Sequence, residues 1–363
     1  MKESDLSLFQ RFPSLRPALP KAKLTELPTP AHRLNNLERA LGASELWIKR
    51  DDQGGQWYGG NKPRKLEFLL GEALAQGART VITFGTLGTH HGLATTICAG
   101  KLGLETVLIL VDEPVRDETR TNLLLCHAHG AKLCYAGTRR RAAALGAWQW
   151  LLHCHPLRRQ FPYLIMPGGS TPRGAIGYVN AALELEEQVR AGELPEPDFI
   201  FVAVGSNGTM AGLEAGLRLT GLRTKVIGVR VSDQVQIKAE SIAKLANDTL
   251  SLLGRHEPEV ASAPRVVAED VTIWHGYLGQ GYAYPTPEAK RAIGLMAEDE
   301  GIKLEFVYTG KTLAALIDAV GRPEFQDKRI LFWNTYNSMP VPGPVHDELD
   351  FRRLPPAFRQ FFP

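Results

Sequence analysis

Lys62 stands directly before a proline that is suited to begin a helix, and this placement bears on its chemistry. Pro63 fits a first helical position because its missing N–H needs no partner there. Leu66, Leu69 and Leu70 continue at helical spacing. A cation at the amino end of a helix is disfavoured, so we expect a lowered pKa for Lys62. Since the neutral amine is the form that makes Schiff bases, the stretch predicts a nucleophilic lysine.

A plainer interpretation of the same stretch stays open. Lys65 lies three residues further on, on roughly the same helical face, and both lysines would then be solvated surface residues. Helices that begin with lysine are common, so this stretch alone does not decide between the two interpretations.

A second candidate site follows an apolar strand expected at 198–204. The glycine-rich turn after it consists of Gly205, Ser206, Asn207, Gly208 and Thr209. Free N–H groups and the dipole of the following helix favour a phosphate there, although a tight turn alone explains the same residues. The turn matches neither the Walker loop nor the dinucleotide fingerprint. Together with Lys62 it favours a Schiff-base cofactor with one phosphate, and pyridoxal 5'-phosphate (PLP) is the obvious one.

Short apolar strands alternate with helical patterns through most of the chain. Strands are expected at 46–49, 80–84, 105–111, 132–135, 163–166, 198–204, 225–231 and 329–334, with helices between most of them. This alternation predicts an α/β protein with parallel sheets. Because the strands are too many for one small sheet, we expect two doubly wound domains.

Composition excludes several classes of function. With 42 basic and 39 acidic residues the formal net charge is only +3, which argues against nucleic-acid or membrane-surface binding. No apolar run approaches membrane-spanning length, and residues 1–5 show no signal-peptide pattern. Four cysteines in 363 residues form no disulfide framework, so we expect reduced thiols and a cytoplasmic location.

Several histidines and cysteines are candidate metal ligands. Cys126 and His129 share one helical face, and 153–155 holds His-Cys-His, but the chain has no pair of CxxC units. Most of these residues fall inside amphipathic helices, so we expect no metal site. His90 and His91 are better interpreted as pocket residues.

Several motifs identify a resemblance to a known family. They are Leu-Pro-Thr-Pro at 27–30, Ile-Lys-Arg-Asp-Asp at 48–52, Gly-Gly-Asn-Lys at 59–62 with Arg-Lys-Leu-Glu-Phe-Leu at 64–69, the glycine loop at 205–212, and Val-Tyr-Thr-Gly-Lys at 307–311. Over nearly its whole length the chain resembles the fold-type II PLP enzymes, in particular the D-cysteine desulfhydrase and 1-aminocyclopropane-1-carboxylate deaminase group. The resemblance implies a fold like the tryptophan synthase β subunit, with two open, doubly wound parallel sheets. It also implies a large PLP-binding domain at 1–65 and 177–363, with a small domain at 66–176 inserted in it.

The resemblance also implies roles for individual residues. Lys62 would be the Schiff-base lysine and the acid/base for the substrate α-proton, and Tyr282 and Tyr308 would face the substrate. Thr309 matches the residue beside the pyridine nitrogen, a glutamate in the deaminases and a threonine or serine in the desulfhydrases. A neutral hydroxyl can bond an unprotonated ring nitrogen, which suits β-elimination. The remaining implied cofactor-binding residues are Asn61, Lys65, His90, Gly205, Ser206, Asn207, Gly208 and Thr209.

Two segments of the expected substrate pocket depart from the family. At 85–91, where a Gln-Ser-Asn run is usual, Thr89 keeps a hydroxyl for the substrate carboxylate, and His90 and His91 follow it. At 334–338, Thr335 matches the desulfhydrases, but Tyr336 and Asn337 replace two glycines. Because both changes lie in the expected substrate pocket, a substrate other than D-cysteine remains an alternative.

These observations favour a cytoplasmic PLP-dependent lyase that performs β-elimination on a small amino acid and releases pyruvate, ammonia and a leaving group such as sulfide. The alternatives in the same class are the deaminase, which Thr309 argues against, and a lyase for another β-substituted amino acid such as cysteate. A catalytically inactive PLP-binding protein is the alternative of a different class, and a nucleotide-binding α/β protein is disfavoured. By the habit of the family we expect a homodimer that binds neither nucleic acid nor membrane.

Overall fold

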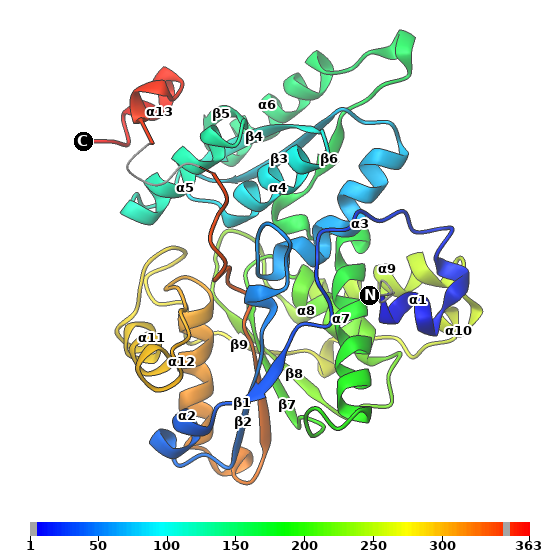
Figure 1. The fold of residues 1–363 in the computed structure, drawn as a ribbon, viewed down its shortest axis with the longest axis vertical. Helices are drawn as coiled ribbons and strands as arrows, with labels where there is room; N and C mark the ends of the chain where they lie inside the picture. Colours follow the sequence, from blue (N-terminus) through cyan, green and yellow to red (C-terminus); the bar gives the residue numbers. More distant parts are fainter. Residues whose placement is uncertain (1–5, 344–348) are drawn as a thin grey trace. The chain divides into compact units, whose positions relative to one another are not determined.

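The computed structural model describes residues 6–343 and 349–363 (Figure 1). Residues 1–5, which show no signal-peptide pattern, lie outside the described part. By their internal contacts the residues form two compact units, the first within Met1–Leu19, Thr25–Lys65 and Ser170–Met339, the second within Pro20–Leu24, Leu66–Gly169 and Pro340–Pro363. The domain division expected from the sequence, with 66–176 inserted in 1–65 and 177–363, stays a prediction. The contact-based units differ from it because 20–24 and 340–363 group with 66–169.

The first unit is built on a six-stranded sheet with the order β1-β2-β10-β7-β8-β9. Its strands are β1 (Ala31–Arg33), β2 (Glu45–Lys49), β7 (Phe199–Val204), β8 (Lys225–Arg230), β9 (Thr272–Trp274) and β10 (Arg329–Trp333). All neighbouring strands pair in parallel except β1, which runs antiparallel to β2. Parallel strands bring their carboxyl ends to one edge of the sheet, which is where ligands bind in doubly wound folds.

Helices lie on both faces of this sheet (Figure 1). One face carries α2 (Asn35–Leu41), α11 (Pro287–Glu300) and α12 (Thr309–Val320), whose apolar residues form one core with β2, β7, β8 and β10. The other helices of this unit are α1 (Ser7–Arg11), α7 (Pro172–Arg190), α8 (Gly208–Leu217), α9 (Ala239–Gly254) and α10 (Pro258–Ala261). The helix α3 (Asn61–Ala75) begins in the first unit and continues into the second.

The second unit contains a four-stranded parallel sheet with the order β5-β4-β3-β6. Its strands are β3 (Thr80–Thr86), β4 (Glu105–Val111), β5 (Lys132–Gly137) and β6 (Tyr163–Ile165), and its further helices are α4 (His90–Lys101), α5 (Asp117–Ala128), α6 (Arg139–Leu152) and α13 (Pro356–Arg359). The central strands β3 and β4 are mostly buried, and β4 has the near-continuous apolar sequence expected of such a strand. The predicted fold class, two parallel-dominated sheets with covering helices, is confirmed.

The structure corrects the predicted start of α3. The helix begins at Asn61, so Lys62 lies inside its first turn and Pro63 is its third residue. Proline is still tolerated there, because the N–H groups of a first helical turn have no partner within the helix.

Candidate active site

Lys62 projects from the first turn of α3 as a half-buried amine. Burial lowers the pKa of this lysine to about 8, while the charge of Glu305 opposes the shift. The lowered pKa agrees with the prediction, but its main cause is loss of solvent rather than the helix terminus. The Nζ atom lies 6.0 Å from the centroid of the Tyr308 ring. An amine with this pKa is substantially neutral near pH 8 and can attack a carbonyl group.

A buried ionic network fixes the chain on either side of Lys62. Both carboxylate oxygens of Asp51 accept from the Arg64 guanidinium, at 2.7 and 3.0 Å, and Glu184 accepts from the same guanidinium at 2.9 Å. Tyr178 and the Trp333 indole also donate to Asp51, at 2.7 and 2.8 Å. Arg64 follows Lys62 by two residues, so the network holds the first turn of α3 against the sheet.

Lys49, at the end of β2, completes this network. Its Nζ donates to Glu184 at 2.6 Å and to the carbonyl oxygen of Thr29 at 2.6 Å, and the side chain is wholly buried. Sequence reasoning assigned no role to Lys49, Asp51, Arg64 or Glu184. The available signal was a run of charges at 49–52 directly after an apolar strand.

The glycine-rich turn leads into α8 and contains a small cradle. Asn207 has a φ of 68°, and Gly208 opens the helix. A Cβ atom added at Gly208 would lie 2.7 Å from Ser170 Oγ and 3.1 Å from Lys65 Nζ, so only glycine leaves this space free. Ser170 accepts from the Gly208 N–H at 3.2 Å and donates to Ser206 at 2.9 Å.

The charge of Lys65 lies at this cradle. The side chain is 1% exposed, and burial, with the nearby charge of Lys62, lowers its pKa well below the usual value. A phosphate placed at the cradle would meet the Lys65 amine, two hydroxyl groups and the positive end of a helix dipole, and its negative charge would favour the ammonium form of Lys65. The donors therefore fit the phosphate of PLP.

Asn61 joins the turn to the loop before α3. Its Nδ2 donates to Thr209 Oγ1 at 3.0 Å, and its backbone N–H donates to the carbonyl of Thr335 at 3.2 Å. Gly60 has a φ of 82°, and a Cβ there would lie 2.7 Å from the carbonyl oxygen of Tyr336. The departing segment 334–338 thus packs directly on the loop that carries Lys62.

Tyr308 lies between Lys62 and the glycine-rich turn. A Cβ added at Gly205 would lie 2.7 Å from Tyr308 Cε1, so the ring packs closely on this turn. The Tyr308 hydroxyl is 2.9 Å from that of Tyr282, and the two rings meet edge to face. The structure therefore brings together both tyrosines that were predicted to face the substrate.

Glu305 is a residue of the site that sequence reasoning missed. Its buried carboxylate accepts from the backbone N–H groups of Val307, Tyr308 and Thr309 at 2.6, 2.8 and 2.7 Å. The only signal was an acidic residue four positions before a helical pattern, which the sequence alone does not distinguish from a surface carboxylate. Its position fixes Tyr308 and Thr309 at the start of α12.

Thr89, His90 and His91 belong to the second unit. Thr89 caps α4 by accepting from the Gly92 N–H at 3.1 Å, His90 Nε2 lies 3.1 Å from Glu118, and His91, which is buried, lies 3.1 Å from the Thr83 hydroxyl. Their predicted roles toward cofactor and substrate stay predictions.

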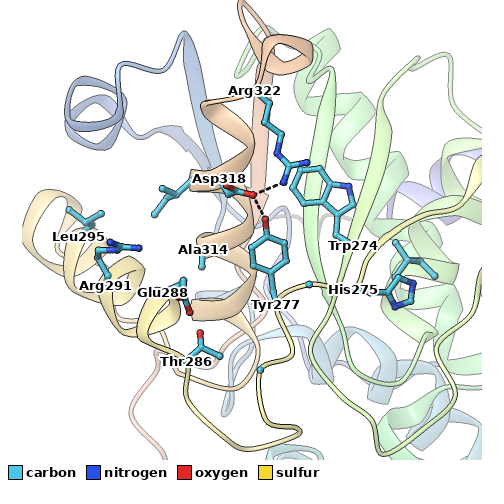
Figure 2. Close-up of a pocket in the computed structure, with 14 residues that line it drawn as sticks. Trp274, His275, Tyr277, Thr286, Glu288, Arg291, Leu295, Ala314, Asp318 and Arg322 are labelled. Carbon is cyan, nitrogen blue, oxygen red and sulfur yellow. Dashed lines mark hydrogen bonds and ion pairs between the residues drawn. The ribbon is translucent and has the colours of Figure 1, made fainter.

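A cavity of about 740 Å³ lies elsewhere in the first unit, beside β9, α11 and α12 (Figure 2). Figure 2 shows Asp318 between Tyr277 and Arg322, and the guanidinium of Arg322 lies 4.4 Å from the centroid of Trp274. Its lining includes none of the residues predicted for the site.

Residues 22–335 match the family of pyridoxal-phosphate-dependent enzymes. This chain belongs to that family. The enzyme is 36% identical over 323 residues to the D-cysteine desulfhydrase of Yersinia enterocolitica, covering 87% of this chain and 93% of that protein. It is 37% identical over 329 residues, with the same coverage, to the D-cysteine desulfhydrase of Serratia proteamaculans. Pyridoxal phosphate is therefore the cofactor of this enzyme.

Solved structures agree. A crystal structure of an ACC deaminase homologue has a TM-score of 0.77 and 31% identity, covering 93% of this enzyme and 98% of that chain. Maize serine racemase, with a TM-score of 0.58 and 14% identity over 92% of this enzyme and 95% of that chain, shares the fold.

Across 6–343 and 349–363, no helix is long and apolar enough to cross a bilayer. The same residues contain no cluster of three or more histidine, cysteine or acidic side chains arranged to hold a metal ion.

Proposed function

We propose that the enzyme is a D-cysteine desulfhydrase-like lyase that performs β-elimination on a small amino acid. The observation that carries the proposal is the amine of Lys62, with a pKa of about 8, which lies 6.0 Å from the Tyr308 ring of a Tyr282–Tyr308 pair that packs on the glycine-rich turn. For D-cysteine the balance is one water consumed and pyruvate, ammonia and hydrogen sulfide released. The 36–37% identity to D-cysteine desulfhydrases supports this choice of reaction.

We assign the roles of the residues from their geometry. When bound, PLP supplies an electrophilic aldehyde and a ring that withdraws electrons from the substrate α-carbon. Lys65, Ser206 and the N–H groups at the start of α8 hold the phosphate. Lys62 uses its neutral amine to take the α-proton at Nζ. Tyr308, bonded to Tyr282 at 2.9 Å, is placed to donate a proton to the leaving group.

A lyase for another β-substituted amino acid, such as cysteate, is the second candidate. The observation that favours it is the segment 334–338, in which Asn337 Oδ1 accepts from the Gly59 N–H at 2.6 Å and Tyr336 lies against Gly60. The Asn337 side chain and the Tyr336 carbonyl occupy room beside the lysine loop, and the amide changes the polar groups available to a substituent. The neutral Thr309 speaks against the deaminase alternative.

We further propose a homodimer. The second unit exposes a group of large apolar side chains on α6, β6 and the segment between them, and a surface of this kind normally marks a contact with another molecule. The most exposed are Trp148 at 56%, Leu151 at 61% and Leu157 at 103%. Light scattering checks the mass, and Leu157→Glu combined with Leu151→Glu would convert a dimer to a monomer.

A cytoplasmic location is supported by the cysteines. Cys98, Cys126, Cys134 and Cys154 are all free thiols, as expected in a reducing compartment.

A panel of D- and L-amino acids tests the reaction. Purified enzyme loaded with PLP is incubated with both cysteines, both cysteates, β-chloroalanines and 1-aminocyclopropane-1-carboxylate, and keto acid, ammonia and sulfide are measured. Pyruvate and sulfide from D-cysteine support the proposal. Keto acid from another member alone names a different substrate, and a loaded protein inert to the whole panel supports the inactive alternative.

A further inference from the structure

Lys311 is a buried lysine in the first turn of α12. Its side chain is 0% exposed, and its Nζ donates to the backbone carbonyl oxygens of Leu278, at 2.8 Å, and Gly281, at 3.2 Å. An ammonium group has three donors and is costly to bury unless they are hydrogen-bonded. The loop at 278–281 is therefore held to α12 by charge-assisted hydrogen bonds, which are stronger than neutral ones.

This loop leads directly into Tyr282. The residue before it, Gly281, has a φ of 144°, and the residue after it, Ala283, has a φ of 66° and is buried. A left-handed backbone is disfavoured for a residue with a Cβ, so contacts outside the segment must maintain this conformation. Both polar groups of the peptide unit between Gly281 and Tyr282 have such a contact. Its carbonyl oxygen accepts from Lys311, and its N–H donates to Asp233 at 3.3 Å.

The helix that carries Lys311 also carries the partner of Tyr282. Tyr308 is the N-cap residue of α12, and Lys311 follows it by three positions, so the two lie on roughly the same face of the helix. The hydroxyl groups of Tyr282 and Tyr308 are 2.9 Å apart. The segment 278–282 therefore meets the start of α12 at two points, which are the Lys311 ammonium and the pair of phenols.

We propose that Lys311 is a positioning residue that holds the Tyr282 hydroxyl against that of Tyr308. The inference rests on the proposed function for its catalytic meaning, because the tyrosine pair is assigned there to the leaving group. Lys311 acts on the reaction only through Tyr282. Sequence reasoning included this lysine in a motif at 307–311 and gave it no role.

The first experiment uses apoprotein that carries 3-fluorotyrosine at position 282 and records the ¹⁹F chemical shift. Tyr308→Phe removes the hydroxyl partner and gives the reference shift of Tyr282 without this bond. Lys311→Met has a similar shape but no donor, so its signal should move most of the way to that reference. Adding Tyr308→Phe to Lys311→Met should cause little further change. A wild-type signal in Lys311→Met overturns the inference.

A milder variant keeps the test decisive if Lys311→Met does not fold. Lys311→Gln retains an N–H donor but is one atom shorter and uncharged, so it cannot hold both carbonyl oxygens. Its ¹⁹F signal should lie between those of the wild type and Tyr308→Phe. A wild-type signal in Lys311→Gln, measured in place of an unfolded Lys311→Met, also overturns the inference.

Tyr277→Phe is the matched control. The Tyr277 hydroxyl donates to Asp318 and so ties the same chain segment to α12, five positions before Tyr282 (Figure 2). Its loss should leave the ¹⁹F signal of position 282 in place. An equal movement in Tyr277→Phe and Lys311→Met would mean that any loosening of the segment displaces Tyr282, and the specific role of Lys311 would then be wrong.

The second experiment is a double-mutant cycle on keto-acid release by the enzyme loaded with PLP. Lys311→Met should lower kcat about tenfold with little change in KM, as expected for loss of the Tyr282 bond. Combined with Tyr282→Phe, the loss should stay about tenfold instead of reaching about a hundredfold, because both changes remove one interaction. Losses that multiply would show that Lys311 does not act through Tyr282.

Failure of the proposed function would look different from failure of this inference. If the proposed function is wrong, wild-type enzyme releases no keto acid, while the ¹⁹F signals of the apoprotein still report whether Lys311 positions Tyr282. If the inference alone is wrong, wild-type enzyme is active and the ¹⁹F signal does not respond to Lys311→Met.

Discussion

The hydroxyl groups of Tyr282 and Tyr308 lie 2.9 Å apart, although 26 positions separate the two residues in the chain. One phenolic proton lies between the two oxygens, and the phenol that accepts this bond still carries a proton of its own. Because Tyr308 also packs on Gly205 and faces Lys62, the pair provides a proton donor close to the amine.

We expect Tyr308→Phe to lower kcat/KM by about 10²- to 10⁴-fold, the usual contribution of a general acid. Tyr282→Phe removes only the neighbour that orients the donor, so its effect should be smaller, about tenfold. Both variants should bind PLP with an unchanged visible spectrum. The rates are measured from pyruvate release, followed by the enzymatic reduction of the pyruvate in a coupled assay.

Tyr284→Phe is the control for this pair, because Tyr284 is 41% exposed and lies only two residues from Tyr282. It should behave as wild type. Wild-type rates in both Tyr308→Phe and Tyr282→Phe would contradict the assignment of the pair to proton transfer.

Lys62→Ala should abolish the visible absorbance that borohydride removes. It should also lower the rate of keto-acid release by about 10³-fold or more, because the nucleophile and the base are lost together. In wild-type apoprotein the rate of PLP uptake should rise with pH and level off above about 8, the pKa of the amine. The sign follows from the neutral form, whose fraction increases as pH approaches that value. Lys62→Arg, which keeps the charge but not the neutral amine, serves as the control, and normal absorbance in either variant would contradict the role.

Gly208→Ala should weaken PLP binding by about 10²-fold, because its Cβ would meet Ser170 Oγ at 2.7 Å and Lys65 Nζ at 3.1 Å in the phosphate cradle. Equilibrium dialysis of apoprotein measures the affinity, and pyridoxal without a phosphate provides the comparison. The affinity for pyridoxal should change little, because pyridoxal has no phosphate to place in the cradle.

Gly294→Ala on α11 is the matched glycine control, because a Cβ there has no neighbour within 4 Å. It should leave PLP affinity unchanged. Equal losses for PLP and pyridoxal in Gly208→Ala would mean that the cradle does not bind the phosphate.

Glu184 makes the free energy of unfolding depend on pH. Burial alone would raise its pKa, but Arg64 and Lys49 outweigh burial and lower it to about 2. The stabilisation is therefore complete above the ordinary glutamate pKa, 4.5, and is lost as pH falls from there toward 2. At neutral pH it contributes on the order of 3 kcal/mol to the free energy of unfolding.

We expect Glu184→Gln to lower the free energy of unfolding by about 3–5 kcal/mol at pH 7, since it leaves two buried cations short of a partner. Urea titrations at pH 7 and pH 4 measure the effect, which should shrink at the lower pH. Glu187→Gln, an exposed neighbour on α7, should change stability by less than about 0.5 kcal/mol.

Much of the fold could be predicted, because most strands are long enough to show an apolar run in the sequence. The strands β3, β4, β7 and β8 lie where the sequence predicts them. The strands β1 and β9 were missed, since each has three residues and neither shows the apolar run by which the equally short β6 was predicted at 163–166. Their pairing with β2 and β8 comes from the tertiary structure.

The site was predictable to the same degree. Lys62 and the glycine-rich turn carry their signal within a few consecutive residues. Glu305 carries no such local signal, because its contribution is to accept hydrogen bonds from the backbone N–H groups of Val307, Tyr308 and Thr309. Arg64 and Glu184 are 120 positions apart, and no local pattern in the sequence connects them.

The single residue between Lys62 and Arg64 has a consequence for laboratory evolution of the enzyme. Any substitution that moves the Lys62 amine must also move the first turn of α3. Arg64 in that turn is held by the buried carboxylates of Asp51 and Glu184. Selections for new substrates should therefore collect few changes at 49–52 or at Arg64, where most variants unfold. They should instead accumulate at 334–338, which meets the same loop through backbone groups, the Asn337 amide and the Ser338 hydroxyl rather than through buried ion pairs.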